Sequence, residues 1–234
     1  DKLPQVRVVS ANIGDRVDVD ILNNNLANKQ YIEALKSGVE GYLYYLINID
    51  NYNAKRKEQL LNLPQKGLSV PMYYTKQDSY KNISYGLDGK KTIEDNGDAI
   101  ISLAMIANYL GIDGASVEDI ASWAGNKYYI KNQGTQPTII SGFADKYNVK
   151  VERIENDKLI ENIEQALKNN KPVLVRLKSG LFGERVTYKV IRGYEDEKFY
   201  LNDPDDNDVK LASYNGFTSN DIKNNLAQAW TISK

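Results

Sequence analysis

The sequence predicts an α+β fold in which a helical half is followed by an antiparallel sheet. Two observations support this prediction. First, the segment Gly97–Leu110 is apolar on almost every side and ends at Gly111, so it is expected to form a buried central helix. Second, from Pro172 onwards apolar residues alternate with polar ones, which is the period of a strand rather than of a helix.

Three further helices are expected between the central helix and the sheet. Ser116 and Asp119 have the spacing of a capping box, which marks a helix start. Pro137 can occupy the first turn of the next helix, and Asn156 can cap the one after it. The expected helices span 117–124, 137 to about 147, and 157–168.

The expected sheet has three strands that can be read from the sequence, at 173–177, 185–194 and 198–202. The last two form a hairpin across Glu195-Asp196-Glu197. If this turn is centred near Asp196, antiparallel pairing sets Thr187 opposite residues 204 to 205 and close to Asp203.

The first 66 residues are predicted to form an N-terminal extension that packs on the main domain. Alternating apolar residues around 6–21 predict a β-hairpin, and apolar residues every three or four positions over 32–49 predict an amphipathic helix, with a shorter helix after it. Pro64 and Gly67 break that pattern. We therefore expect a boundary between 1–66 and a domain at 67–234.

Composition excludes several classes of function. The 234 residues include no Cys and no His, so disulfides, thiol nucleophiles, imidazole bases and zinc, haem or iron–sulfur sites are ruled out, and no cofactor is expected. Thirty basic and 31 acidic residues give a net charge of −1, which does not favour nucleic acid as a partner. Any catalysis would have to use carboxylates or hydroxyls.

The expected location is outside the cytosol. The sequence has no apolar run near the roughly 20 residues of a spanning helix, so no transmembrane segment is predicted. Asp1 is not an initiator Met, and we expect a bacterial secreted or cell-surface protein whose signal or anchor was removed before Asp1. The sequence does not indicate an oligomeric state.

Short motifs in a consistent order give the chain a resemblance to a known family. They are Val70-Pro71 with Gln77-Asp78, Thr92-Ile93 leading to Gly97-Asp98 and Ser102-Leu103-Ala104-Met105, Lys171-Pro172-Val173, Arg192-Gly193-Tyr194, and Asn202-Asp203-Pro204. Together they resemble the papain-fold cysteine peptidases related to the bacteriocin-leader (double-glycine) processing enzymes. The resemblance covers roughly residues 68 to 210 and implies a papain-like fold.

The resemblance also implies where a catalytic site would lie. In that family a Gln helps to bind the oxyanion, a Cys opens the central helix, a His lies on a strand and an Asp or Asn ends the next strand. By position, Asp98 stands in the Cys place and Asp203 in the Asp place. Thr187 stands in the His place, with Tyr188 as the other candidate, and Gln77 lies near the oxyanion position.

The replacements predict loss of the family's chemistry. An acid at Asp98 has a structural explanation as an N-cap or first-turn residue, because helix N-termini favour negative charge. Thr187 cannot accept and release a proton near neutral pH, so it cannot replace an imidazole base. Without the nucleophile and the base, Asp203 and Gln77 do not make a cysteine peptidase.

The segment after the last predicted strand also suggests the hypothesis of a calcium-binding site. Asp203, Asp205 and Asn207 imitate the first three ligand positions of a calcium-binding EF-hand loop, but Asp208 replaces the turn Gly and Tyr214 replaces the closing Glu. A solvated acidic loop is therefore favoured, and no metal site is expected.

The sequence thus favours a non-hydrolytic module that binds a peptide or a secreted or envelope protein in the cleft between its halves, with Tyr188 and Asn202 as candidate ligand contacts. One alternative is a hydrolase in which Asp98 and Asp203 form a carboxylate pair that shares a water or a proton. A second alternative is a structural envelope protein that binds through residues 1–66. The identity of the ligand is not predicted.

Overall fold

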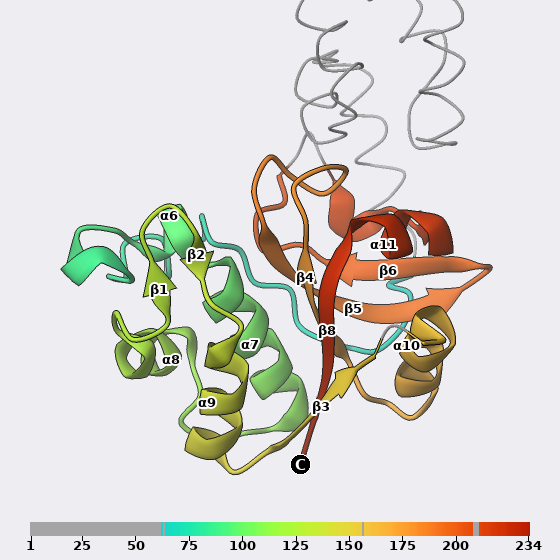
Figure 1. The fold of residues 1–234 in the computed structure, drawn as a ribbon, viewed down its shortest axis with the longest axis horizontal. Coiled ribbons are helices and arrows are strands. Elements are labelled where there is room, and N and C mark those ends of the chain that lie inside the picture. Colours follow the sequence, from blue (N-terminus) through green and yellow to red (C-terminus); the bar gives the residue numbers. More distant parts are fainter. Residues whose placement is uncertain (1–61, 63, 156, 208–210) are drawn as a thin grey trace, which may run out of the picture.

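The computed structural model describes residues 62, 64–155, 157–207 and 211–234. This part of the chain forms a helical half joined to a six-stranded antiparallel sheet, which confirms the predicted α+β class (Figure 1). The hairpin and helices expected before residue 62, and Asn156, lie outside the described residues.

The central helix α7 (Asp98–Leu110) was predicted with an error of one residue at its start. Every residue from Ala99 to Ala107 is buried, because the segment is apolar on all sides and other elements cover it. The helix ends at Gly111, whose φ of 62° is the left-handed conformation that glycine adopts without strain.

All three other predicted helices are present, and two of them begin within one residue of the predicted position. α8 (Val117–Ala124) starts at the predicted capping box, in which the Ser116 hydroxyl accepts from the Asp119 N–H at 3.1 Å. α9 (Thr138–Tyr147) follows Pro137. The shorter elements of this half are η2 (Leu87–Gly89), α6 (Ile93–Asn96), β1 (Tyr129–Ile130) and β2 (Gly134–Thr135).

The predicted start of the third helix is wrong. α10 (Leu159–Lys168) begins two residues later than expected, after Lys158 in left-handed conformation. Its apolar face, made by Leu159, Ile163 and Leu167, starts only at Leu159. The preceding Asp157 is exposed and has no apolar side chain to pack, so tertiary packing rather than a cap fixes where this helix begins.

The sheet contains more strands than the sequence indicated. Its order is β3-β8-β4-β5-β6-β7, and every neighbouring pair is antiparallel. The predicted strands correspond to β4 (Val173–Leu177), β5 (Thr187–Glu195, two residues shorter at its start) and β6 (Lys198–Asn202). The strands that were not predicted are β3 (Lys150–Ile154), β7 (Phe217–Thr218) and β8 (Leu226–Ser233). The remaining elements are η3 (Ala212–Tyr214) and α11 (Ser219–Asn225).

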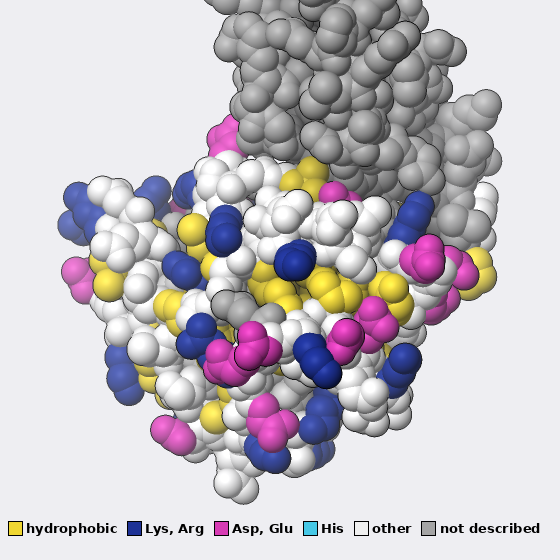
Figure 2. Space-filling model, turned by 45° about the vertical axis from the view of Figure 1, so that its right-hand side comes forward, with side chains coloured by type: hydrophobic (Ala, Val, Ile, Leu, Met, Phe, Trp, Pro, Cys, Tyr) yellow, Lys and Arg dark blue, Asp and Glu magenta, His cyan; other side chains and the backbone are white. Residues whose placement is uncertain are grey.

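The sheet separates two hydrophobic cores. On one face, Leu174, Val190 and Trp230 pack with α7 and the helical half. On the other face, alternate strand residues such as Val175 and Ile191 pack with α10 and α11 (Figure 1). Both faces of the central strands are therefore buried. On the face in Figure 2 the apolar side chains gather mainly in a band near the middle, with smaller spots scattered among polar and charged residues.

The crossing segment, residues 66–75, joins the two halves: it bonds to the sheet half, and Tyr73 N donates to Met105 Sδ in α7 at 3.3 Å. Leu68 N donates to the Arg192 carbonyl at 2.7 Å, and Thr75 N donates to the Pro204 carbonyl at 2.9 Å. The buried Arg192 guanidinium donates to carbonyl oxygens of Lys66, Leu201 and Ser213 and to the Asn202 side chain. No helix among the described residues is long and apolar enough to cross a membrane.

Candidate functional site

The structure brings the predicted Cys and His positions together where α7 meets β5. Asp98 is the first residue of α7, and Thr187 is the first residue of β5. The Tyr188 N–H donates to Asp98 Oδ2 at 2.6 Å, so the two elements are joined at these residues. Asp98 is an acid in the first turn of α7, as expected, but the N-cap of the helix is Gly97. The Asp98 carboxylate accepts its hydrogen bond from Tyr188 in β5 rather than from its own helix.

The surroundings of Asp98 disfavour its charge. Burial raises the pKa of this partly exposed carboxyl to about 7, and the negative charge of Asp205 contributes in the same direction. The hydrogen bond from the Tyr188 N–H and the Lys189 ammonium act in the opposite direction. The pKa of Asp98 is therefore raised well above its ordinary value of 3.8.

Thr187 has a buried hydroxyl next to this carboxyl. The residue is 7% exposed, and its Oγ1 has no hydrogen-bond partner. The hydroxyl nevertheless acts on Asp98 as a long side-chain hydrogen-bond donor, because it lowers the pKa of that carboxyl.

Asp203, which stands in the place of the family's Asp, forms a buried ion pair with Lys189, two residues along β5 from Thr187. Lys189 Nζ lies 2.5 Å from Asp203 Oδ1, and the two residues are 1% and 0% exposed. The sheet register explains the pairing: Val190 pairs with Asn202, so the next residue along each strand brings 189 opposite 203. Asp203 Oδ1 also accepts from the Asp205 N–H at 2.9 Å.

Sequence reasoning missed Lys189. The available signal was a lysine directly before the apolar pair Val190-Ile191 in β5, two residues from Thr187 and therefore on the same side of the strand. A lysine at a fully buried strand position needs an anionic partner, and the strand register would have named Asp203.

The remaining predicted site residues have internal partners. Gln77 Nε2 donates to Ser79 Oγ at 3.0 Å within its own turn, so its oxyanion role stays a prediction. The buried Tyr188 hydroxyl donates to the Thr135 carbonyl at 2.9 Å. The Asn202 amide donates to the Val70 and Pro71 carbonyls.. A direct ligand contact by Tyr188 or Asn202 therefore also stays a prediction.

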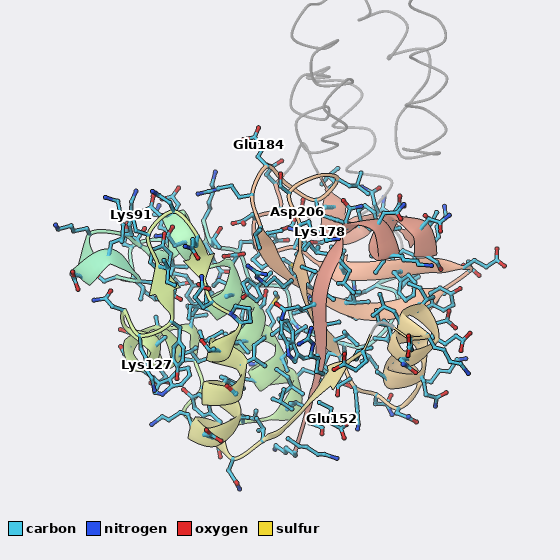
Figure 3. All side chains as sticks on the ribbon, in the orientation of Figure 1. Lys91, Lys127, Glu152, Lys178, Glu184 and Asp206 are labelled. Atoms are coloured by element: carbon cyan, nitrogen blue, oxygen red, sulfur yellow. The ribbon has the colours of Figure 1, made fainter. Side chains whose placement is uncertain are left out.

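The acidic loop after β6 has a structural role. Asp205 Oδ1 accepts from Thr75 Oγ1 at 2.7 Å, although the residue itself is exposed. Asp206 is buried, and its carboxylate accepts from the N–H groups of Asn207, Ala212 and Ser213 at 2.8–2.9 Å. In Figure 3 Asp206 lies at the upper edge of the sheet half, below the projecting β4–β5 loop that Glu184 marks.

These contacts are relevant to the hypothesis that Asp203, Asp205 and Asn207 bind calcium. Asp203 is ion-paired to Lys189, and Asp205 bonds the crossing segment. Within 64–155, 157–207 and 211–234, no group of three or more acidic side chains is placed to hold a metal ion. The described loop is thus organised by lysine, hydroxyl and backbone N–H groups.

With this geometry in place, the chain can be compared with known proteins. A family model described as the Peptidase C39 like family matches residues 67–234, and the chain belongs to this family. The suspected resemblance and the papain-like α+β fold are thereby confirmed. No curated protein matches the chain.

Three solved structures are similar to part of the chain. One is a protein from Bacillus anthracis described as a C39-like peptidase, with 18% identity, a TM-score of 0.48, and coverage of 73% of this chain and 98% of that one. The second is the peptidase domain of Streptococcus ComA, with 16% identity, a TM-score of 0.46, and coverage of 65% and 97%. The third is a double glycine motif protease from an AMS/PCAT transporter in complex with its leader peptide, with 12% identity, a TM-score of 0.45, and coverage of 73% and 95%.

Proposed function

We propose that this protein is a non-hydrolytic member of the peptidase family that binds a peptide or a segment of a secreted or envelope protein. The single observation that supports it most is the pairing of Lys189 with Asp203. The carboxylate that would orient a general base is held by a permanently buried ammonium instead.

Two further features support loss of hydrolysis. Asp98 stands at the nucleophile position, but its Oδ2 is hydrogen-bonded to the Tyr188 N–H. A carboxylate is also a poor attacking group for a peptide carbonyl compared with a thiolate. Thr187 has no proton to exchange near neutral pH, so a water at this site would have no general base from β5.

The proposal that the protein binds a peptide is supported by its membership of the family. The family is one of peptidases, whose fold is shaped to receive a polypeptide chain, and that shape does not depend on the nucleophile. Here α7 and β5 retain their mutual packing, which brings residues 98 and 187 together. This packing supports the proposal that the site holds an extended chain without cleaving it.

The raised pKa of Asp98 is the one observation that favours a hydrolytic alternative, because a carboxyl that titrates near pH 7 can act as a general acid. That alternative pairs Asp98 with Asp203. Asp203, however, is fully buried and bonded to Lys189, so it cannot share a water with Asp98. A binding function fits the described contacts better.

Capture of peptides from a random library on the full chain tests the proposal. We expect enrichment of intact peptides, and we expect Asp205→Arg, which places a bulky cation at an exposed position beside Asp98, to reduce that enrichment at least tenfold. Glu118→Arg is the matched control, because Glu118 is an exposed acid in the first turn of α8. Cleaved products, or equal enrichment by both variants, would overturn the proposal.

A further inference from the structure

A row of three polar side chains lies where the sheet meets the helical half. Gln228, Arg176 and Tyr188 are direct partners across β8, β4 and β5, so their side chains project from the same face of the sheet. The next row on this face is apolar and packs into the core of the helical half: Trp230, Leu174 and Val190. The polar row therefore forms the edge of that core, at the end of β4.

The polar row is connected to the position of the lost nucleophile. Tyr188 donates its N–H to Asp98 and its hydroxyl to the Thr135 carbonyl of β2, so it links β5 to the helical half. The β4–β8 register shifts between Arg176 and Leu177, as it does at a β-bulge. Bulges bend a strand and re-aim its side chains, and they are frequent beside functional sites.

Arg176 is a half-buried cation without an anionic partner. Its Nε is buried and has no hydrogen-bond acceptor, and the side chain forms no ion pair within the part of the chain that the structure describes. Burial raises the pKa of the Tyr188 hydroxyl, so this neighbour is neutral near pH 7, and Gln228 on the other side carries no charge. The guanidinium acts on the Tyr188 hydroxyl as a hydrogen-bond donor, which leaves most of its five N–H groups for another acceptor.

The accessible polar atoms of Gln228 and Arg176 are donors. Gln228 is half-buried with its Oε1 buried and unbonded, whereas its Nε2 is neither buried nor bonded within the described ranges. The terminal nitrogens of Arg176 are likewise not buried. The pair thus presents N–H groups outward, and an acceptor is the ligand that such groups bind.

The segment after Arg176 adds positive charge around the polar row. Residues 176–186 contain three basic residues, Arg176, Lys178 and Arg185, and one acid, Glu184. Lys178 and Arg185 are exposed, and neither forms an ion pair with a described residue. Glu184 lies at the outer end of the loop in Figure 3. The charge of this edge therefore favours an anionic ligand over a neutral one.

We infer that Arg176 and Gln228 bind a carboxylate of the bound polypeptide, either an acidic side chain or a free carboxyl terminus. The inference rests on the proposed peptide-binding function and adds the chemical class of the recognised group. A carboxylate accepts hydrogen bonds at two oxygens, which matches the paired N–H groups of a guanidinium beside an amide N–H. It also supplies the counter-charge that Arg176 lacks.

A carboxylate fits this edge better than a phosphate does. Phosphate sites commonly use the N-terminus of a helix, whereas the polar row is built from three strands. Arg176 is also the one cation of the row, and a single guanidinium matches the single charge of a carboxylate. A phosphate is therefore an outcome of the test rather than the proposal.

Calorimetry with three pentapeptides at pH 7 tests the inference on the full chain. The first is an acetylated amide with a central glutamate, the second has glutamine in its place, and the third is an acetylated alanine peptide with a free carboxyl terminus. We expect the glutamate or the free-carboxyl peptide to bind at least tenfold more tightly than the glutamine peptide, and which of the two does so identifies the source of the carboxylate. A phosphoserine peptide that binds more tightly than both would overturn the choice of carboxylate.

Matched variants assign the preference to this site. Arg176→Gln should remove most of the preference for the carboxylate, whereas Arg153→Gln, at an exposed arginine on β3 of the same sheet, should leave it unchanged. Gln228→Glu places a carboxylate opposite Arg176 within the protein and should also remove the preference, which keeps the test decisive if Arg176→Gln fails to fold. A preference that survives both Arg176→Gln and Gln228→Glu would overturn the inference.

Failure of the inference differs from failure of the proposed function. If all three peptides bind equally, peptide binding stands and the carboxylate site is wrong. If no peptide binds, the proposed function fails, and titration with sodium propionate tests the site alone. Amide NMR shifts at Tyr188 and Gln228 that propionamide does not cause and that Arg176→Gln abolishes would support the site, and their absence would overturn it.

Discussion

The buried Lys189–Asp203 pair gives the sharpest test of what stabilises the sheet where Asp203 stands in the place of the family's Asp. Replacing Lys189 by Met leaves the Asp203 carboxylate fully buried without its ammonium partner. Replacing Asp203 by Asn leaves the ammonium in the same condition. An exposed ion pair is worth about 0–1 kcal/mol, but removing one member of a buried pair typically costs about 3–5 kcal/mol.

The burial of this pair indicates that loss of one partner has the cost of a buried ion pair rather than of an exposed one. Both residues are essentially inaccessible to water, so neither remaining charge could be solvated without opening the sheet. The double variant Lys189→Met/Asp203→Asn removes both charges, and its Asn can still accept from the Asp205 N–H. We therefore expect each single variant to lose about 3–5 kcal/mol, and the double variant to lose about 0–2 kcal/mol.

Urea unfolding at pH 7 measures the free energy of unfolding of the natural protein, the two single variants and the double variant, which together form a double-mutant cycle. The expected coupling is at least about 4 kcal/mol. Single variants that each lose less than about 1 kcal/mol, or losses that add in the double variant, would refute the buried ion pair as the stabilising contact.

Three other variants test separate parts of the account. Asp98→Asn should flatten the dependence of the free energy of unfolding on pH. The folded-state pKa of Asp98 is raised, so its ionisation destabilises the fold progressively from about pH 4 to pH 7. At pH 8 the variant should therefore be more stable than the natural protein by about 2 kcal/mol, after allowance for solvent screening of a partly exposed group. Parallel pH curves would contradict this. Gly67→Ala should lower the melting temperature more than Gly89→Ala, because both glycines have positive φ but only a Cβ at Gly67 would overlap Arg192 and Gly193. Equal losses in calorimetry would refute a close approach there. Arg192→Met should cost about 3 kcal/mol in urea unfolding, because it leaves carbonyl groups of the crossing segment, β6 and η3 without a donor, and a loss under 1 kcal/mol would contradict that role.

The sequence predicted elements whose signal is local. α7 was predictable because its apolar residues surround the helix and Gly111 stops it, and α8 because its capping box lies in four consecutive residues. The β5–β6 hairpin was predictable because alternating strands flank a two-residue turn, at which Asp196 and Glu197 have positive φ.

Elements that depend on distant partners were missed. β3 is short and largely exposed, and it becomes a strand only because the last strand, β8, pairs with it. β8 in turn lies between β3 and β4, a position that no local pattern specifies. The start of α10 was misplaced for the same reason, since packing of Leu159 fixes it.

In the candidate site, too, some features could be predicted from the sequence and others depend on contacts between distant residues. The juxtaposition of 98 and 187 was predicted from family positions, and the Tyr188–Asp98 bond is in accord with it. The partners were not predictable in detail: Asp98 bonds to β5, and Asp203 is bonded to a lysine that no motif indicates. Those contacts arise from side chains that meet across the sheet, and only the register connects them.

The most direct test of the central claim is turnover of a random peptide library by the full chain from pH 4 to pH 9, measured by mass spectrometry with Asp98→Asn as the matched control. The account predicts no cleavage by the natural protein beyond that of the variant at any pH. Cleavage that the natural protein catalyses and Asp98→Asn loses while still folded would contradict it.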